Sequence, residues 1–590
     1  MDIQLERILQ KTQKPGRYTG GEINQVLKNK EKVDLRIAFC FPDTYEIGMS
    51  NLGLAILYGI LNRIDGVWCE RAFAPWVDME EQMRLNGLVL YGLESGDPIR
   101  YFDIIAFSIG YELSYTNVIN MLDLAGIKPR ANDRTPGDPI VIAGGTCCYN
   151  PEPLSDFIDM FLIGEGEEII VEVIDICRTL KAAGAGKSEI LETASSISGV
   201  YVPSLYNISY NNDGTISGIE AQRGAALPVI KRIVKNLNES FFPIDTIVPS
   251  TEIVHDRVAI ELFRGCSHGC RFCQAGYVYR PVRSRSCDVL VRQGIEALET
   301  TGYDELALLS LSSSDYSKIF ELCDGLLDWC EPRKKSISLP SLRADNFSIE
   351  LMDRIQRVRK SGLTFAPEAG SQRLRDVINK DVTESELLET CRIAFAGGWN
   401  SVKLYFMLGL PTETDDDVTA IADISHAVLE TWKRCAKYKS KGVRIAVSTS
   451  CFVPKPHTPF QWEAQITVDE YSRRVELLRS NLRSKAIIYN WHSPEQGYIE
   501  AALARGDRRI GRVIETAWLL GARLDSWSEF FSIDKWLNAF EINMLDAGFF
   551  ANRERDNNEI LPWSVISAGL LTKHLQAERE AARGFQKTQT

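Results

Sequence analysis

The sequence predicts an α/β protein: an open parallel sheet comes first, a partial β/α barrel of six strands follows, and a helical region comes last. Short apolar runs alternate with helical patterns, which is typical of parallel sheets. These runs form two groups, separated near residues 201–255 by a hairpin pattern. The predicted organisation is a leading arm at 1–34, an α/β domain at 35–200, a small β element at 201–255, the barrel at 256–500 and the helical region at 501–590.

The first domain begins with the apolar run Val33–Phe41, which predicts a buried strand, and a helical pattern follows from Leu52 to Leu61. Further strands are predicted at Ile104–Phe107 and Ile140–Ala143, the second ending in Gly144-Gly145. In such sheets, ligands bind beyond the carboxyl ends of the strands. Asn211-Asn212-Asp213-Gly214 then predicts the turn of the hairpin in the small β element.

The barrel is predicted from six evenly spaced runs, with chemistry expected on the loops that follow the strands. The runs are Val258–Phe263, Leu306–Leu311, Ser336–Leu342, Leu363–Ala366, Val402–Leu408 and Val443–Cys451. The tail carries four tryptophans in helical patterns, at 518, 527, 536 and 563.

Composition narrows the possible functions. The chain has 590 residues, 79 acidic and 67 basic, for a net charge of −12, which argues against binding nucleic acid through an overall positive field. No apolar run approaches the ~18 residues of a membrane span, and the acidic start does not resemble a signal peptide. We therefore expect a cytoplasmic protein with no membrane partner. Its 14 cysteines then indicate metal ligands and core residues rather than disulfides.

The most specific motif is Cys266-x3-Cys270-x2-Cys273, directly after a predicted strand. Three thiolates at this spacing can hold three irons of a [4Fe-4S] cluster and leave the fourth iron open. The alternatives are a zinc site completed by His268 and an electron-carrying cluster with a fourth cysteine.

The motif and its position resemble the radical SAM superfamily, in which the open iron binds S-adenosylmethionine (SAM). The resemblance implies SAM contacts from an aromatic residue before the last cysteine and from the loops after the second, fourth and fifth strands. Matched onto this sequence, those residues are Phe272, Ser312, Ser313, Glu368, Gly370, Ser371, Gly409 and Glu413. The second loop lacks the common Gly-Gly-Glu form. For Glu368 and Glu413, helix capping is the alternative role. No catalytic side chain is assigned.

Two basic stretches allow a functional and a structural interpretation. Five arginines between 264 and 285 either trap an anion, such as the SAM carboxylate or a substrate phosphate, or belong to a solvated loop balanced by acids elsewhere. A second stretch, from Arg473 to Lys485, is interpreted first as a solvated helix face and second as an RNA contact.

The turn Asp43-Thr44-Tyr45-Glu46-Ile47-Gly48 resembles the D-x-H-x-x-G turn of cobalamin-binding Rossmann-like domains, with tyrosine in the histidine position. The same resemblance places Ser108, Gly144 and Gly145 along the nucleotide tail of cobalamin. Because the first histidine is His255, this domain has no imidazole to offer. Either cobalamin binds without a histidine ligand, or the domain keeps the fold and has lost the cofactor.

Over nearly its full length the chain is similar to the family of cobalamin-binding-domain-containing radical SAM proteins. The resemblance implies SAM cleavage to a 5′-deoxyadenosyl radical, an electron donor such as flavodoxin or ferredoxin, and an unknown substrate: a small molecule, RNA or protein. With cobalamin, methyl transfer is expected. The competing functions are methylthiotransferase-like modification, with a second cluster on cysteines 40, 69, 147 and 148, and a non-catalytic Fe–S sensor or assembly protein.

Overall fold

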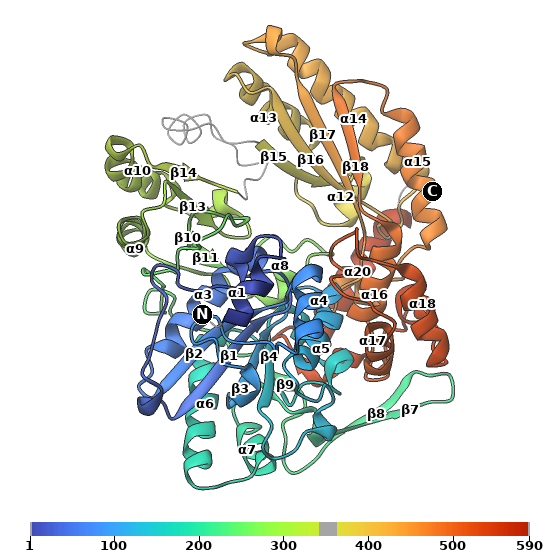
Figure 1. Cartoon of the computed structure of the whole chain (residues 1–590). Coiled ribbons are helices and arrows are strands. Elements are labelled where there is room, and N and C mark those ends of the chain that lie inside the picture. Colours follow the sequence, from blue (N-terminus) through green and yellow to red (C-terminus); the bar gives the residue numbers. More distant parts are fainter. Residues whose placement is uncertain (1–2, 341–362, 588–590) are drawn as a thin grey trace. The chain divides into compact units, whose positions relative to one another are not determined.

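A computed structural model describes residues 3–340 and 363–587 of the chain (Figure 1). The chain divides into two compact units. The first comprises Met1–Asp256, Leu503–Ala547 and Asn558–Gly569, and the second comprises Arg257–Ala502, Gly548–Asn557 and Leu570–Thr590. The predicted α/β class is confirmed, and the predicted helical tail is divided between the two units.

The first unit is built on a six-stranded sheet with the order β2-β1-β3-β4-β5-β6. Its strands are β1 (Leu35–Phe41), β2 (Val67–Phe73), β3 (Ile104–Ser108), β4 (Ile140–Gly144), β5 (Met160–Leu162) and β6 (Val200–Tyr201). The first five are parallel, and β6 is antiparallel to β5. This is the flavodoxin-like doubly wound order, in which a ligand crevice forms where the connections reverse direction, between β1 and β3.

Two short helices come first: α1 (Ile3–Leu9) precedes β1, and α2 (Tyr45–Gly48) follows it. The longer helices around the sheet are α3 (Leu52–Asn62), α4 (Val77–Asn86), α5 (Tyr115–Leu124), α6 (Gly166–Ala182) and α7 (Lys187–Ala194). The predicted strands β1, β3 and β4 and the predicted helix α3 are all present. Strand β2 was not predicted, because Glu70 and Arg71 interrupt its apolar run. Both are fully buried.

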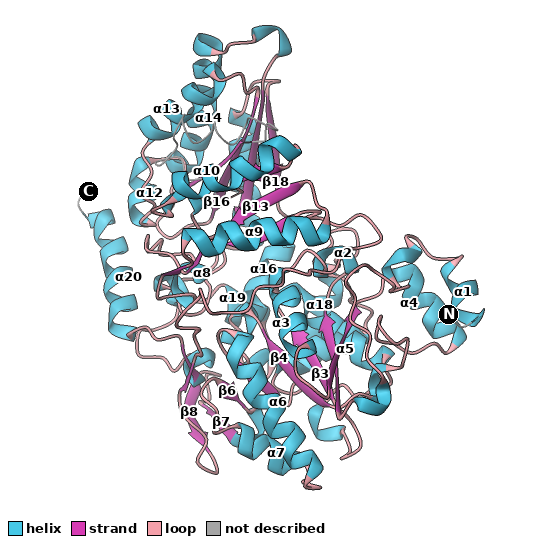
Figure 2. Cartoon of the chain, turned by 90° about the vertical axis from the view of Figure 1, so that its left-hand side faces the viewer, coloured by secondary structure: helices cyan, strands magenta, loops and turns pink. Residues whose placement is uncertain are grey.

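Two segments complete the first unit. The predicted hairpin forms from β7 (Tyr206–Tyr210) and β8 (Ile216–Ala221), visible as a separate pair in Figure 2. From the tail come α17 (Ile510–Leu519) and α18 (Ile533–Ile542), and β19 (Ile566–Ser567), which pairs with β9 (Val229–Ile230). The tail binds α5: the indole Nε1 of Trp518 donates to Asn120 Oδ1 at 3.1 Å.

The second unit contains all six predicted barrel strands in their predicted order. One sheet is β10 (Val258–Glu261), β13 (Glu305–Leu309) and β14 (Ser336–Ser338); the other is β15 (Leu363–Glu368), β16 (Ser401–Leu408), β17 (Arg444–Cys451) and β18 (Ile487–Trp491). Within each sheet the strands are parallel. Strand β18 is an addition to the prediction, and positions 341–342 of the predicted third strand lie outside the described residues.

The helices of the second unit follow the strands. They are α8 (Gln274–Val278), α9 (Cys287–Thr301), α10 (Ile319–Cys330), α12 (Gln372–Val377), α13 (Glu384–Ala396), α14 (Asp415–Cys435), α15 (Val468–Asn481), α16 (Pro494–Ala504, whose last two residues belong to the first unit) and α20 (Thr572–Lys587). Alternate residues of β16, including Val402, Leu404 and Phe406, pack beneath α13, α14 and α15, which lie along one face of this sheet (Figure 1). Tyr405, on the other face, is 41% exposed. Among the described residues, no helix combines the length and apolar character needed to cross a bilayer.

Candidate functional site

The three motif cysteines lie on the loop that follows β10 and the two-residue strand β11 (Phe263–Arg264). Gly265 starts the loop with φ +91°, and a Cβ there would lie 2.8 Å from the carbonyl oxygens of Tyr279 and Pro281. Cys266, Cys270 and Cys273 are half-buried, whereas nine of the other eleven free cysteines are buried. Burial raises the pKa of the Cys273 thiol to about 11, and the neighbouring cysteines add to this effect. A thiolate at this position therefore requires a cationic partner, which a bound iron provides.

The loop fits a cluster better than it fits zinc. His268, the predicted fourth zinc ligand, instead places Nε2 2.6 Å from Asp315 Oδ2, on the loop after β13. Across residues 3–340 and 363–587, no three His, Cys, Asp or Glu side chains converge as ligands of one metal ion. Cysteines that each bind a different iron of a [4Fe-4S] cluster do not have to converge on one point.

The loop after β13 contributes buried hydroxyls. Ser313 is fully buried, and its Oγ donates to the Leu308 carbonyl oxygen at 3.0 Å, so it holds the loop. Ser312 is 1% exposed, and within the described parts of the chain its Oγ has no hydrogen-bond partner. An orphaned buried hydroxyl is costly unless a ligand completes it. Ser312 therefore fits a SAM-contacting role more closely than Ser313 does.

The loop after β15 begins with a strained residue. Glu368 has φ +68°, and the β15–β16 register shifts between Phe365 and Glu368. Its carboxylate lies 3.3 Å from Lys380 Nζ, and its charge raises the pKa of Cys273. The carboxylate therefore lies close enough to Cys273 to affect its ionisation. Non-glycine residues with positive φ are uncommon and concentrate at functional sites.

Gly370 and Ser371 have structural roles in the same loop. A Cβ on Gly370 would lie 2.4 Å from Ile421 N and 2.6 Å from Asp417 O, so glycine allows the loop to approach α14. Ser371 is the N-cap of α12: its Oγ accepts from Leu374 N at 3.1 Å and also bonds Asp417. Because Ser371 is that cap, Glu368 is not.

The turn after β16 is held by Glu413. Gly409 has φ +89°, and its N–H donates to Glu413 Oε2 at 2.7 Å. Arg474 on α15 pairs with the same carboxylate. Burial raises the pKa of Glu413 to about 7, and Arg474 acts in the opposite direction. Since Thr414 caps α14, Glu413 does not cap it; it anchors the turn. Its predicted contact with SAM stays a prediction.

These loops meet at the carboxyl ends of the strands. Phe272 packs against a buried apolar cluster that joins the loops after β15, β16 and β17 through Ala369, Leu410 and Phe452. Gln274 Nε2 also donates to the Pro456 carbonyl oxygen at 3.3 Å. The structure therefore brings the cysteine loop together with two of the loops predicted to lie at the site, those after β15 and β16, and also with the loop after β17. The His268–Asp315 contact links it to the third predicted loop, after β13.

The arginines of segment 264–285 are mostly engaged within the unit. Arg264 pairs with Glu261 at 2.9 Å, and Arg271 pairs with Glu578 at 3.0 Å and donates to two carbonyl oxygens. Arg283 donates to backbone carbonyls, and Arg280 lies over the Tyr277 ring. This pattern favours the structural interpretation over an anion trap.

The second basic stretch is neutralised in the same way. Arg473 pairs with Asp415 and Glu470, Arg474 with Glu413 and Glu470, and Arg479 with Glu476. A surface whose cations already have acidic partners has little net positive charge to offer a phosphate backbone. The solvated helix face is therefore the better interpretation of α15.

In the first unit, the crevice between β1 and β3 is occupied by the chain's own tail. Asp43, directly after β1, accepts from the indole Nε1 of Trp527 at 2.9 Å and from Ser526 Oγ at 3.1 Å. On the β3 side, Asn117 Oδ1 accepts from Leu524 N at 2.8 Å. Trp527 also packs edge-on against Trp76, with ring centroids 5.1 Å apart. Sequence patterns gave no signal for this contact, because its partners lie more than 400 residues apart.

Tyr45 does not fit the predicted place beneath a corrin ring. It is 1% exposed, its hydroxyl donates to Glu22 Oε1 at 2.8 Å, and its ring packs edge-on against Phe73. Gly48 packs tightly as well, since a Cβ there would lie 2.3 Å from the Phe73 ring. Packing and hydrogen bonding within the unit therefore explain both residues, and they do not form a place for a corrin ring.

The carboxyl ends of β3 and β4, next to the crevice, are more open. Ser108 and Gly144 are half-buried, and Gly145 is exposed. Gly145 has φ +112°, and a Cβ there would lie 2.4 Å from the Ile109 carbonyl oxygen. Glycine at 145 is therefore required for a close approach of two backbone segments, whatever binds beyond it.

The amino-terminal cysteines considered for a second cluster have the burial of core residues. Cys40, Cys69, Cys147 and Cys148 are all buried, and burial raises the pKa of the Cys40, Cys69 and Cys148 thiols. They are better explained as core residues.

Comparison with known proteins identifies two regions. Residues 53–203 match the family described as "Radical SAM proteins, N-terminal", and residues 260–424 match the "Radical SAM superfamily". The uncharacterized protein MJ0966 of Methanocaldococcus jannaschii is 28% identical over 530 residues, covering 88% of this chain and 99% of its own. A tRNA-2-methylthio-N(6)-dimethylallyladenosine synthase of Neorickettsia sennetsu is 20% identical over 39% of this chain and 48% of its own.

Two solved structures are similar at a lower level. The radical SAM methyltransferase TsrM from Kitasatospora setae, with cobalamin and a [4Fe-4S] cluster, has a TM-score of 0.46 at 14% identity over 72% of this chain and 73% of its own. The cobalamin-dependent enzyme OxsB has a TM-score of 0.46 at 11% identity over 94% of this chain and 79% of its own. Similarity at this level supports no conclusion about the cofactors or the reaction of this chain. The first match covers the sheet of the first unit from β2 to β6, and the second covers the cysteine loop; together these two matches place the chain in the radical SAM superfamily.

Proposed function

We propose that the chain is an enzyme that reductively cleaves SAM and uses the resulting radical to modify a substrate. The proposed cofactor is a [4Fe-4S] cluster on Cys266, Cys270 and Cys273. A cluster bound there would offer SAM an open iron and supply the single electron, from an external donor, that cleaves the sulfonium carbon–sulfur bond into methionine and a 5′-deoxyadenosyl radical. The observation that supports this most directly is the position of three half-buried thiols on one loop at the carboxyl end of β10, with His268 turned to Asp315.

The surrounding residues support SAM binding in different ways. Ser312 offers a buried hydroxyl with no partner among the described residues, and Glu368 offers a carboxylate beside the cysteine loop. Phe272 provides an apolar surface on the same loop. Gly370, Ser371, Gly409 and Glu413 are proposed to shape the loops, since each has an internal packing or hydrogen-bonding reason for its identity.

The substrate stays open among small molecules, RNA and protein. The argument for RNA from α15 is weak, because Arg473, Arg474 and Arg479 already have acidic partners. An electron donor such as flavodoxin or ferredoxin and a cytoplasmic location belong to the proposal, because the cluster needs single electrons and all 14 cysteines are free thiols.

The test is SAM cleavage by anaerobically reconstituted protein reduced with dithionite. We expect slow formation of 5′-deoxyadenosine without substrate, and none after Cys266, Cys270 and Cys273 are all replaced by alanine. Cys435→Ala is the matched control, since Cys435 is also half-buried in the second unit. A protein that binds the cluster and SAM but forms no 5′-deoxyadenosine would be a sensor or assembly protein instead.

Methylthiotransferase-like modification is less well supported. In methylthiotransferases three cysteines of the amino-terminal domain hold a second cluster, whereas the candidate cysteines here are buried, and burial raises the pKa of the Cys40, Cys69 and Cys148 thiols. Cobalamin-assisted methyl transfer is supported by the open β3–β4 edge and opposed by the engaged Asp43 and Tyr45. Neither reaction is part of the proposal.

A further inference from the structure

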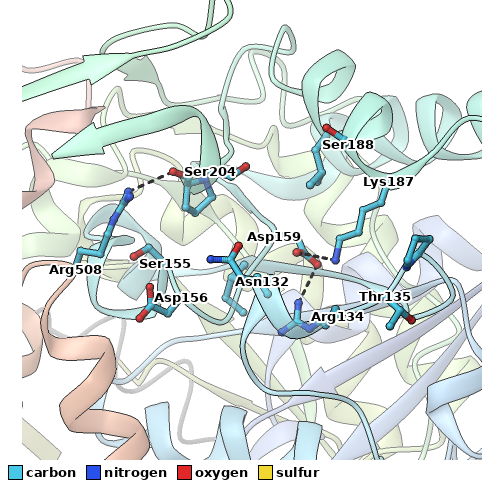
Figure 3. A pocket seen from close by; sticks show the side chains of 15 residues that line it. Asn132, Arg134, Thr135, Ser155, Asp156, Asp159, Lys187, Ser188, Ser204 and Arg508 are labelled. Atoms are coloured by element: carbon cyan, nitrogen blue, oxygen red, sulfur yellow. Dashed lines mark hydrogen bonds and ion pairs between the residues drawn. The ribbon is translucent and has the colours of Figure 1, made fainter.

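A cavity of about 300 Å³ lies in the first unit (Figure 3). It is at the amino ends of β4 and β5, whereas the β1–β3 crevice is at the carboxyl ends of the strands. Its walls are residues 131–136 before β4, residues 155–159 before β5, the start of α7, Pro203-Ser204 and Arg508. None of the residues predicted to contact SAM or cobalamin lines it. Its volume is at the lower end of small-molecule sites, which span roughly 300–1,000 Å³.

One end of the cavity is rich in hydrogen-bond donors. Asp159 forms ion pairs with two cations: its Oδ2 lies 2.9 Å from Arg134 Nη1, and its Oδ1 lies 2.9 Å from Lys187 Nζ. The other acid close to these cations, Asp138, accepts from the backbone N–H and the hydroxyl of Thr135. A lysine ammonium carries three donors, and in the described parts of the chain Lys187 has only the ion pair with Asp159.

Lys187 is also the first residue of α7, an eight-residue helix with no side-chain cap at Gly186. The backbone N–H groups of Lys187 and Ser188 have no acceptor among the described residues. A lysine in the first turn opposes the helix dipole, so an anion bound there would stabilise both the helix and the lysine. Ser188 adds an exposed hydroxyl at the same point.

A second feature indicates a ligand with hydroxyl groups. Ser155 lines the cavity and is only 7% exposed, and its hydroxyl has no hydrogen-bond partner within the described residues. Asn132 and Asp156 line the cavity beside it. Burial raises the pKa of Asp156, whose carboxylate is 3.5 Å from Arg130. These groups, an amide, a hydroxyl and a poorly paired carboxylate, are typical partners of sugar hydroxyls.

We propose that this cavity binds a small phosphorylated metabolite that also carries hydroxyl groups. Its phosphate lies at the start of α7, against the N–H groups of Lys187 and Ser188, the Ser188 hydroxyl and the Lys187 ammonium. Its hydroxyls face Ser155, Asn132 and Asp156. The site goes beyond the proposed radical chemistry, because it lies at the amino ends of the strands, away from the crevice at their carboxyl ends, and shares no residue with the cysteine loop.

The test is calorimetric titration of the full chain with ribose 5-phosphate, inorganic phosphate and ribose. We expect ribose 5-phosphate to bind at least about tenfold tighter than phosphate, and ribose alone to give no measurable binding. Equal, weak binding of phosphate and ribose 5-phosphate would mean an adventitious ion only and would overturn the proposal. SAM cleavage does not enter this readout, so the two proposals fail independently.

Two substitutions of one exposed residue separate binding from folding. Ser188→Glu places an acid in the first turn of α7, which favours the helix, while its charge repels a phosphate. We expect this variant to keep or raise the melting temperature and to lose at least about tenfold in affinity for ribose 5-phosphate. Ser188→Gln removes the hydroxyl bond without adding a charge, so it should lose less affinity than Ser188→Glu, about threefold. Equal affinity in Ser188→Glu and the unchanged protein would also overturn the proposal.

Discussion

At the scale of single residues, the three motif cysteines differ from the rest because they are half-buried together on one loop. We expect reconstituted protein to bind about four irons and to show the absorption near 400 nm that such clusters give (roughly, depending on cluster type). Replacing all three cysteines by alanine should abolish both signals. Full iron and sulfide in this triple variant would place the cluster on other cysteines.

Glu413 gives a pH-dependent prediction. Burial raises its pKa to about 7, from an ordinary value of 4.5, so the folded chain holds a proton that the unfolded chain has lost between these pH values. The contribution of this group to stability is therefore complete below pH 4.5 and declines as pH rises to 7. Between pH 5 and pH 8, Glu413→Gln should gain stability relative to the unchanged protein, by up to about 3 kcal/mol.

Denaturant unfolding of the two proteins at pH 5 and pH 8 measures this difference. Glu389→Gln is the matched control, because Glu389 is exposed on α13 in the same unit and should show no such pH-dependent gain. A constant difference between Glu413→Gln and the unchanged protein at both pH values would show that Glu413 is already ionised at pH 5.

At the scale of elements, Gly370 holds the loop after β15 against α14. A Cβ there meets three backbone atoms of α14 within 2.7 Å, and backbone cannot rotate away as a side chain can. Gly370→Ala should therefore lower the free energy of unfolding by about 1–3 kcal/mol and weaken SAM binding, since overpacking forces the loop to move.

The control for this prediction is Gly584→Ala on α20. Among the described residues, apart from the neighbouring residues and the backbone of α20 itself, no atom lies within 4 Å of the Cβ that this change adds, and alanine favours a helix over glycine by about 1 kcal/mol. Chemical denaturation and SAM titration measure both variants. A Gly370→Ala protein as stable as the unchanged protein would mean that α14 shifts without cost.

The strands that the sequence predicted, the six of the barrel and β1, β3 and β4, each carry at most one charged residue. Strand β2 carries two, Glu70 and Arg71, side by side in its middle. Arg71 is paired with Glu22 at 2.9 Å and with Glu94 at 2.6 Å, and all three are fully or almost fully buried. A buried ion network of this kind resembles a surface segment in the sequence and is recognised only when its distant partners are placed.

In the candidate site, too, the sequence predicted the local features and missed the contacts between distant residues. The cysteine motif specifies its ligands locally, and the order of strands specified which loops would lie beside it. The sequence did not indicate that Ser371 caps α12, that Arg474 binds Glu413 or that His268 faces Asp315, because each partner belongs to another loop or helix.

At the scale of the whole molecule, the tail segment 524–530 folds back by way of Trp527 into the crevice of the first unit. Doubly wound sheets bind ligands at this position, and here Asp43 and Asn117, one on each side of it, hold the chain's own tail. Burial raises the pKa of Asp525 to about 6, and its Oδ2 accepts a hydrogen bond from the Thr116 hydroxyl at 2.8 Å. This segment is therefore withdrawn from water. A corrin ring would have to displace these contacts to reach Asp43 or Tyr45.

We therefore expect that full-length protein mixed with hydroxocobalamin retains less than about a tenth of an equivalent after desalting, since a ligand must overcome the cost of opening a closed segment. Trp527→Ala, which removes the indole bond to Asp43 and the packing on Trp76, should raise the retained amount if the tail is the barrier. Trp518→Ala is the control, because Trp518 lies on α17 and bonds α5 rather than Asp43. Stoichiometric retention by the unchanged protein would show that the tail yields to the cofactor, and the absence of nitrogen coupling in its reduced spectrum would then confirm binding without a histidine ligand. No retention by any variant would instead mean that the crevice holds its own tail in place of a cofactor, so that the radical reaction proceeds without cobalamin.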